Sequence, residues 1–385
     1  MTNVGEVRPS EMETYIDKKS GKEIIKLTKT GTNIHFYFTD NSFTLGDKEI
    51  IYLHSDAHLS DTSTIFDVYS MNLETGESVR LTDLGARFKK VHSYTKTKDS
   101  KKILFIADED LYCFERETGE IRLLYRVPVG NFVLQNPHIS FDNRYVVLLA
   151  NHKGDESILK PGNSQENYYG FKEKLFIRKY GYIIIARMDG SGGDIVFEDT
   201  HRLGHTQFAP DTNEYLMFCH EGPWDYVHQR IWMFNTITRH VKPCFLQFED
   251  DCVGHEFWTD DGLVFFDNRG KGHDGTINSD KTQAITAIDE SSDAIPYIGF
   301  VDKECNMVRK VELPFYCNHY HANSDNTILV GDAVEDIMLI NISGEEATQE
   351  ILCEHNTSWR WQDTHCHPCW SWSNDKILFA SYDGC

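Results

Sequence analysis

The sequence contains no long apolar run and almost no helical periodicity. No stretch approaches the roughly 20 apolar residues that a membrane-spanning helix requires, so we expect no membrane insertion. The first thirty residues are polar and charged, without the apolar core of a secretory signal peptide. These absences predict a cytoplasmic protein.

Basic residues are in deficit, with 38 Lys and Arg against 60 Asp and Glu, and the formal net charge is −22. Such a charge argues against nucleic acid and anionic membranes as partners. It also repels acidic sugars at long range. A site for a polyuronate would therefore have to be locally cationic, through a metal ion or arginines.

Several catalytic and cysteine motifs are missing. There is no G-x-S-x-G nucleophile motif, which argues against a peptidase-associated propeller. The ten cysteines are scattered, and the C-x-x-C from Cys366 to Cys369 has no second copy that would complete a zinc site. We expect free thiols.

Short β-rich runs dominate what is present. Five of them follow turn-forming Gly, Asp, Asn or Ser clusters, which is the pattern of a hairpin. These runs are 49–53, 102–106, 145–149, 263–266 and 376–380. A second element, strands joined by a Thr-Gly or Ser-Gly turn, occurs at 17–28, 73–82 and 117–124. Hairpins repeating every ~40 to 65 residues predict the four-stranded blades of a β-propeller.

We count blades by a histidine near the start of each innermost strand. The series is His92, His138, His205, His255, His319 and His367, and one more blade begins near Phe36. The sequence thus predicts an all-β, seven-bladed propeller of four-stranded blades, a single domain over residues 1–385. Because the last unit is short, we expect an N-terminal strand segment to close the ring. The alternative fold is a pair of β-sandwiches, which would not explain the repeated Thr-Gly element.

The densest chemical motif lies near the C-terminus. His365 and His367 are two residues apart, a spacing that puts both imidazoles on one face of a strand. Neutral imidazoles bind divalent transition metals, and Gln362 could add an oxygen ligand. His319 and His321 repeat the spacing one blade earlier. The alternative is a set of hydrogen-bonded core histidines that bind no metal.

Two further residues have catalytic chemistry. His255 begins another inner strand and is a candidate base, with a packed structural histidine as the alternative. Arg230 begins an otherwise apolar strand, and an arginine there needs an anion. Either a substrate carboxylate or a structural Asp or Glu would serve.

An ordered set of motifs resembles a known family. It runs through Cys219 to Pro223, Arg230 to Trp232, Gly254 to Trp258, Thr357 to Trp359, and Gln362-x-x-His365-x-His367-Pro368. Together these resemble the oligogalacturonate lyases of polysaccharide lyase family 22. The resemblance covers nearly the whole chain, and its most specific motifs lie in the C-terminal half.

The resemblance implies a metal centre and its site residues. It implies a Mn²⁺ ion, or another divalent cation, bound by three histidines and a glutamine. On this sequence the ligands become His319, Gln362, His365 and His367. Register with the Val330-Gly331-Asp332 strand selects His319 rather than His321. The resemblance also makes His255 the base and Arg230 the partner of the substrate carboxylate, and we assign substrate binding to Arg230, His205 and His220.

The implied reaction is β-elimination on a small acidic oligosaccharide, a short and unsaturated oligogalacturonide from pectin. The metal and arginine would stabilise the charge that develops when the base removes the C5 proton. The product would be a 4-deoxy-5-keto uronate. The alternatives are a non-enzymatic propeller that binds a partner, or a lyase acting on another uronide.

Overall fold

The computed structural model describes most of the chain. The described residues are 3–127, 130–164, 166, 169–223, 226–249, 251–269, 295–313 and 315–382, without the side chain of Gln362. Residues 270–294 lie outside them, so the insertion that the long interval between His255 and His319 predicts there is not described.

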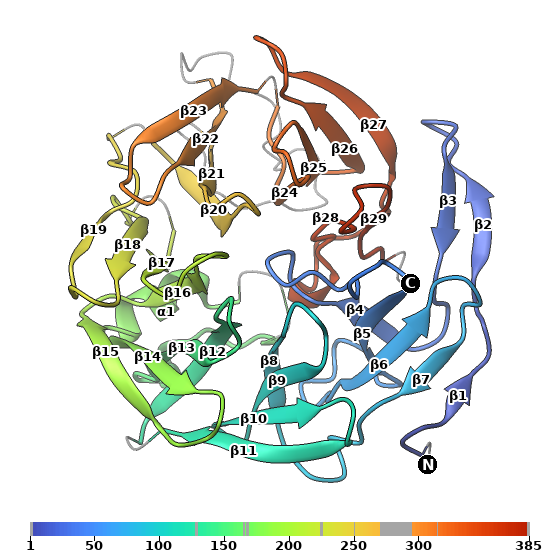
Figure 1. The fold of residues 1–385 in the computed structure, drawn as a ribbon, viewed down its shortest axis with the longest axis horizontal. Coiled ribbons are helices and arrows are strands. Elements are labelled where there is room, and N and C mark those ends of the chain that lie inside the picture. The colour runs from blue at the N-terminus through green and yellow to red at the C-terminus, as the bar shows by residue number, and fades with distance from the viewer. Residues whose placement is uncertain are drawn as a thin grey trace.

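Six antiparallel sheets are arranged radially around a central axis, as blades of a propeller (Figure 1). Apart from β1, which is added to the first blade, their strands follow one another in chain order, so each blade is a meander. The first blade contains β4 (Thr32–His35), β5 (Glu49–Ser55), β6 (Asp67–Asn72), β7 (Ser78–Arg80) and β1 (Val7–Arg8). The second contains β8 (Val91–Lys96), β9 (Lys102–Ala107), β10 (Asp110–Glu115) and β11 (Glu120–Arg126). The third contains β12 (Phe132–Ile139), β13 (Tyr145–His152), β14 (Gly181–Arg187) and β15 (Gly193–Asp199).

The remaining three blades repeat this order. The fourth contains β16 (Leu203–Phe208), β17 (Tyr215–His220), β18 (Ile231–Asn235) and β19 (Val241–Pro243). The fifth contains β20 (Val253–Trp258), β21 (Val264–Asn268), β22 (Tyr297–Val301) and β23 (Met307–Glu312). The sixth contains β24 (Tyr320–Ala322), β25 (Ile328–Asp332), β26 (Asp336–Asn341) and β27 (Thr348–Glu354).

The prediction of seven four-stranded blades is wrong, because the structure has six, and the first of these has five strands. Near the termini, β2 (Glu13–Ile16) pairs only with β3 (Glu23–Lys26), and β28 (Cys369–Trp370) pairs only with β29 (Ile377–Leu378), among the residues described. These are two separate two-stranded sheets. The predicted closure of the ring by an N-terminal strand is also not found, since β1 extends the outer edge of the first blade.

Side chains, rather than a backbone ladder, attach the N-terminal hairpin to the sixth blade. Lys19 Nζ lies 2.7 Å from Asp336 Oδ2, and Lys22 Nζ lies 2.8 Å from Glu350 Oε1. The amide of Glu354 donates to the Asp17 carboxylate at 3.2 Å. The hairpin therefore lies beside β26 and β27 without joining their sheet, and it adds no blade to the six.

The blades pack through alternating faces of their middle strands. In β13, Val146, Leu148 and Ala150 belong to the core cluster shared with the second blade. Val147 and Leu149 belong to the cluster shared with the fourth blade. Both faces of the strand are thus buried, which explains why these strands read as continuous apolar runs in the sequence.

The innermost strands carry a recurrent β-bulge near the channel. The register shifts after His92, Gln135, Gly204 and Val253, at the corresponding point of four blades. These four residues are therefore structural equivalents, so the histidines used to count blades do not occupy equivalent positions. A bulge re-aims the side chains beside it.

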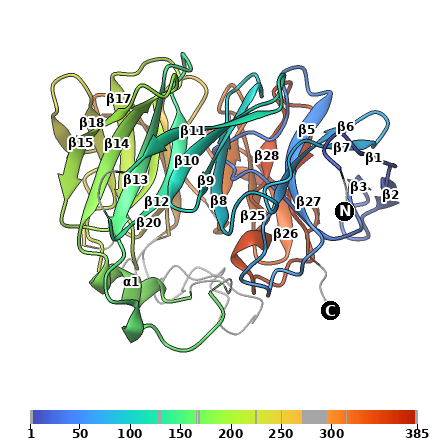
Figure 2. The same ribbon diagram turned by 90° about the horizontal axis from the view of Figure 1, so that it is seen from below.

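The interval from 153 to 179 forms an insertion between β13 and β14. It contains a 3₁₀ turn (Glu156–Ile158) and the helix α1 (Phe171–Ile177), which lies beyond the strand ends on one face of the ring (Figure 2). Within the described ranges, no helix has the length and apolar character needed to cross a bilayer.

Candidate metal centre and active site

Three histidines converge where the inner ends of the sixth blade and the C-terminal segment meet. One nitrogen of each of His319, His365 and His367 lies within 4.8 Å of the others. The ring centroids of His319 and His367 are 4.2 Å apart, and those of His319 and His365 are 5.5 Å apart. Three imidazoles this close form a suitable set of ligands for one transition-metal ion.

The backbone around His365 and His367 is irregular, and not the strand that their spacing predicts. His365 follows the 3₁₀ turn Gln362–Thr364, and His367 has a left-handed conformation with φ of 42°. Their rings nevertheless lie 5.6 Å apart. A left-handed residue of this kind is uncommon and typical of functional sites.

The nitrogens of these rings fit a metal. Both ring nitrogens of His365, and Nε2 of His367, are buried without a hydrogen-bond partner in the described structure. Burial, with the neighbouring His319, lowers the pKa of both imidazoles well below the usual value. Neutral, buried, unpaired nitrogens are costly unless a ligand satisfies them.

Asp332 fixes the third histidine. Its carboxylate lies 2.8 Å from His319 Nδ1 and also accepts the backbone amide of His319 at 2.6 Å. Both side chains are buried. With Nδ1 bonded to Asp332, Nε2 of His319, which lies 3.3 Å from the Asn318 side-chain nitrogen, is the ring nitrogen that a metal would take.

His321 is not part of this cluster. It lies two residues further along β24, stacks on Phe257 with centroids 5.8 Å apart, and accepts the amide of Trp370 at 3.2 Å. The structure therefore places the histidine that was selected, His319, beside His365 and His367. Gln362 lies in the 3₁₀ turn just before His365, but its side chain is outside the described structure.

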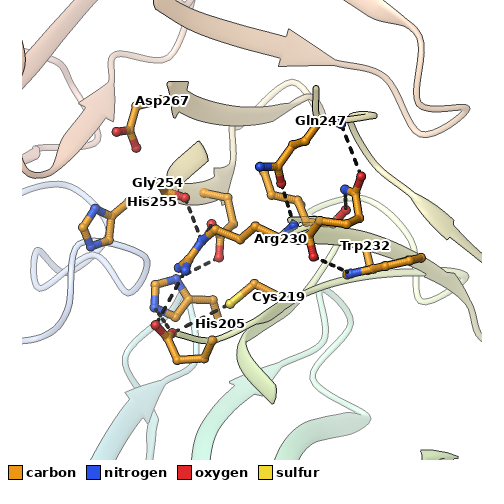
Figure 3. A network of polar contacts seen from close by, with 12 residues as sticks. His205, Cys219, Arg230, Trp232, Gln247, Gly254, His255 and Asp267 are labelled. Carbon is orange, nitrogen blue, oxygen red and sulfur yellow. Dashed lines mark hydrogen bonds and ion pairs between the residues drawn. The ribbon is translucent and has the colours of Figure 1, made fainter. Parts of the chain in front are cut away.

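Arg230 is buried in a network of charges in the fourth and fifth blades (Figure 3). Its Nε donates to Glu256 Oε2 at 2.9 Å and to the carbonyl of Gly254 at 3.0 Å. Its Nη1 lies 3.6 Å from Glu221 Oε1. Structural carboxylates thus face Arg230, which was the alternative to a substrate carboxylate. Nη2 forms no hydrogen bond to any described residue.

His205 joins the same network. Its Nδ1 lies 3.0 Å from Glu256 and its Nε2 lies 3.4 Å from Glu221. Although burial acts to raise the pKa of Glu221, the charges of Arg230, His205 and Arg202 lower it to about 2. The carboxylates of Glu221 and Glu256 therefore alternate with the basic side chains of Arg230 and His205 in a closed circuit of ion pairs.

His255 lies between the metal-type cluster and the arginine network. Its ring centroid is 4.5 Å from that of His319 and 5.9 Å from that of His205. Arg269 Nη2 lies 3.3 Å from His255 Nδ1. Burial, together with His319 and Arg269, lowers the pKa of His255 well below its usual value, so the imidazole is neutral.

Comparison with known proteins identifies the family. Residues 3–384 match the family model described as oligogalacturonate lyase. The chain belongs to the oligogalacturonate lyase family. It is a polysaccharide-acting lyase of pectin degradation.

Known members are distant in sequence and close in fold. The oligogalacturonide lyase of Pectobacterium atrosepticum is 22% identical, with 97% of this chain and 93% of the relative covered. The oligogalacturonate lyase of Dickeya dadantii is 22% identical, with 96% and 92% covered. An oligogalacturonate lyase solved in complex with manganese superposes with a TM-score of 0.81 at 21% identity, over 99% of this chain and 95% of that one. The Vibrio parahaemolyticus oligogalacturonate lyase gives 0.79 at 23% identity, over 99% and 96%.

One predicted site residue of this lyase lies apart from the others. The His220 side chain is directed toward Asp199, with Nε2 3.0 Å from Oδ2, and stacks on His201 at a centroid distance of 4.0 Å. The other described residues, Arg230, His205, His255, His319, His365 and His367, form one continuous group.

Two residues of the lyase site escaped the sequence analysis. Tyr37, from the loop after β4, has its ring 4.7 Å from His367, 6.2 Å from His319 and 6.0 Å from His205. Arg269 follows β21 and contacts both His255 and Asn318. Arg269 directly follows the strand Val264–Asn268, and a charged residue there is the signal that could have indicated it. Tyr37 lies among aromatic residues, between Phe36 and Phe38, and no local signal distinguishes it.

Proposed function

We propose that this lyase site cleaves short oligogalacturonates by metal-assisted β-elimination to 4-deoxy-5-keto uronates. The observation that carries the proposal is the convergence of His319, His365 and His367, with unpaired buried nitrogens, beside His255. A hydrolase would instead use two carboxylic groups across the scissile bond.

The three histidines, with Gln362 as the fourth ligand, would hold one divalent cation, which we propose to be Mn²⁺. A solved member of the family contains manganese, which supports this choice. When bound, the cation supplies positive charge that lowers the energy of the carboxylate as negative charge develops at C5. Asp332 orients His319 for this role.

His255 is proposed as the base that removes the C5 proton. The C5–H bond breaks and its electrons form the C4–C5 double bond, while the bond from C4 to the leaving oxygen breaks and that oxygen takes the bonding electrons and a proton from water. The 4,5-unsaturated uronate, once released as a monomer, opens and tautomerises to the 4-deoxy-5-keto form. A neutral imidazole with a low pKa is a weak base. Electrostatic stabilisation of the developing charge must therefore supply much of the rate.

Arg269 connects substrate binding to this base. An arginine only donates, so the Nδ1 atom that faces it carries the lone pair of the neutral His255 ring. The contact is long, at 3.3 Å. A substrate carboxylate that attracts the Arg269 guanidinium would free this nitrogen for the C5 proton.

Arg230 is proposed to bind the substrate carboxylate through Nη2. Glu221 and Glu256 hold its other side and thereby fix the direction of the guanidinium. We propose that His205 contacts the sugar beside Arg230. We propose that His220 contacts the substrate only at the outer edge of the binding site, where its ring stacks on the exposed His201.

We further propose that residues 1–385 act as one domain in the cytoplasm, with a small acidic oligosaccharide and neither nucleic acid nor a membrane as partner. The net charge of −22 supports the exclusion of nucleic acid and anionic membranes. The nine cysteines in the described ranges are free thiols, which is typical of a reducing compartment.

The test is the metal content and activity of protein purified without added metal. We expect about one divalent ion per chain, loss of digalacturonate cleavage after chelation, and recovery with Mn²⁺. The His365→Ala/His367→Ala variant should contain no metal, while His240→Ala, at an exposed position, should match the wild type. Full metal occupancy in the double variant would exclude this site.

A further inference from the structure

Arg202 has an unusual environment in a protein with such an excess of acidic residues. It lies between β15 and β16, and its Nε and Nη1 atoms are buried without a hydrogen-bond partner among the described residues. Within the described ranges, Arg202 forms no ion pair, and the Glu221 carboxylate pairs with Arg230 and His205 instead. Burial lowers the pKa of this guanidinium. The positive charges of Arg178 and Arg230 lower this pKa further, and the negative charge of Glu221 opposes them. A desolvated cation without an anion is costly to fold.

The insertion that carries α1 covers this arginine. The Phe171 ring centroid lies 5.8 Å from Arg202 Cζ. Leu175 packs so tightly on Gly222 that an added Cβ would lie 2.9 Å from its Cδ1. α1 is therefore seated against the loop that follows β17, below the strand ends in the side view of Figure 2.

Two more cations of the insertion lie close by. Lys174 Nζ donates to the carbonyl of Tyr169 at 2.8 Å, which leaves its charge without a carboxylate partner in the described structure. Burial, with Arg178 and Arg202, lowers the pKa of Lys174 to about 8. Arg178 pairs with Glu156 at 3.1 Å, but its Nε is buried and unpaired.

This cationic cluster adjoins the catalytic network. The amide of Glu221 donates to the carbonyl of Arg202 at 2.9 Å, and the Glu221 side chain contacts both Arg230 and His205. An anion bound at Arg202 would therefore lie next to the network of Arg230 and His205, which we propose binds the uronate that is cleaved. In an oligogalacturonate, a second carboxylate follows on the next sugar.

We propose that Arg202 binds the carboxylate of a second uronate unit, with Lys174 and Arg178 supplying the surrounding positive charge. This inference rests on the proposed function and extends it. It makes the insertion a specificity element that selects oligomers over monomers, and it gives the buried guanidinium an anion that the described residues do not provide.

The test measures affinity for digalacturonate and for galacturonate by calorimetry, in the metal-loaded His255→Asn enzyme, which should bind without turnover. Arg202→Met should raise the Kd of the dimer by about 10- to 150-fold, since a hydrogen bond to a charged group is lost. Arg202→Lys should lie between, because it keeps the charge and loses the fork. Binding of the monomer should change by less than about twofold, since the monomer fills only the site beside His255.

Thermal unfolding without ligand separates this role from a structural one. Arg202→Met removes a buried charge that forms no ion pair among the described residues, so its Tm should be unchanged or higher, whereas a structural arginine would lower it on removal. Arg87→Met, at an exposed turn, is the matched control and should leave both affinities and the Tm unchanged.

Each outcome decides a different question. If Arg202→Met binds the dimer as tightly as its parent, or weakens dimer and monomer equally, the second-unit site is wrong while the proposed function stands. A parent enzyme that binds no galacturonate in either form would overturn both.

Discussion

His319 Nδ1 and Asp332 Oδ2 are 2.8 Å apart, and this hydrogen bond sets which nitrogen of the histidine faces the other two imidazoles. Asp332 lies on β25, directly across the hairpin from His319, and is fully buried. A carboxylate in this position fixes the ring orientation and raises the basicity of the ligand.

We therefore expect Asp332→Asn to weaken metal binding about 10- to 100-fold while the fold is retained. Competition with a chelator of known affinity would measure the change. Asp336→Asn, on the next strand of the same blade, removes a surface ion pair to Lys19 and should leave metal affinity unaltered. Equal metal affinity in the two variants would contradict the assignment of Asp332.

The two histidines of the Asn318–His321 motif should behave differently. His319→Ala should lose the metal, because it removes one of few ligands. His321→Ala should keep it, since that ring stacks on Phe257 and accepts the amide of Trp370. Metal analysis after dialysis distinguishes them, and the reverse result would place the metal elsewhere in the channel.

Substitutions of His255 and of Arg230 should have different effects on turnover and on substrate affinity. His255→Asn should reduce turnover by about 10² to 10⁴-fold with metal content and substrate affinity retained, since proton transfer occurs only in the transition state. Arg230→Lys should impair both binding and turnover, because a lysine cannot reproduce the contacts to Glu256 and the substrate together. Near-normal turnover by His255→Asn would eliminate it as the base.

Tyr37 should contribute to substrate binding without binding the metal. Its ring packs on His367, and burial, with Glu256 and Glu221, raises the pKa of its phenol well above the usual value. The hydroxyl therefore stays protonated and can donate to a sugar oxygen. Tyr37→Phe should raise the Kd of digalacturonate by about 2- to 10-fold, whereas Tyr180→Phe, at an exposed position, should not. Loss of metal in Tyr37→Phe would indicate a structural role instead.

The Glu221 carboxylate should make stability depend on pH. Its pKa is lowered to about 2, so its contribution is present above about pH 4.5 and is lost as the pH falls toward 2. Glu221→Gln should cost about 3 kcal/mol at pH 7 and remove this acid-sensitive part. Urea unfolding between pH 7 and pH 3 measures both effects. Glu117→Gln, which removes an exposed ion pair to Lys101, should cost less than about 0.5 kcal/mol.

Local patterns in the sequence predicted the building units. The run from Tyr145 to Leu149, after an Asp-Asn turn, predicted a strand, and the structure has β13 over Tyr145–His152. Likewise, the spacing of His365 and His367 predicted a pair of neighbouring imidazoles, although the backbone that brings them together is irregular. Such patterns act over a few residues, where turn propensity and alternation are decided.

The sequence by itself thus determined that the chain is built from repeated β-hairpins, that its surface is acidic, and that a cluster of histidines lies near its C-terminus. Only the tertiary structure decided that there are six blades, because hydrogen bonding between β1 and β7 or between β28 and β29 depends on which strand edges meet in space. It also decided the partners of each charge. Arg230 and Arg202 each directly precede a strand of the fourth blade, yet two glutamates surround the first and none pairs with the second in the described structure. Desolvation and pairing depend on neighbours that are distant in the sequence, and no local sequence pattern specifies them.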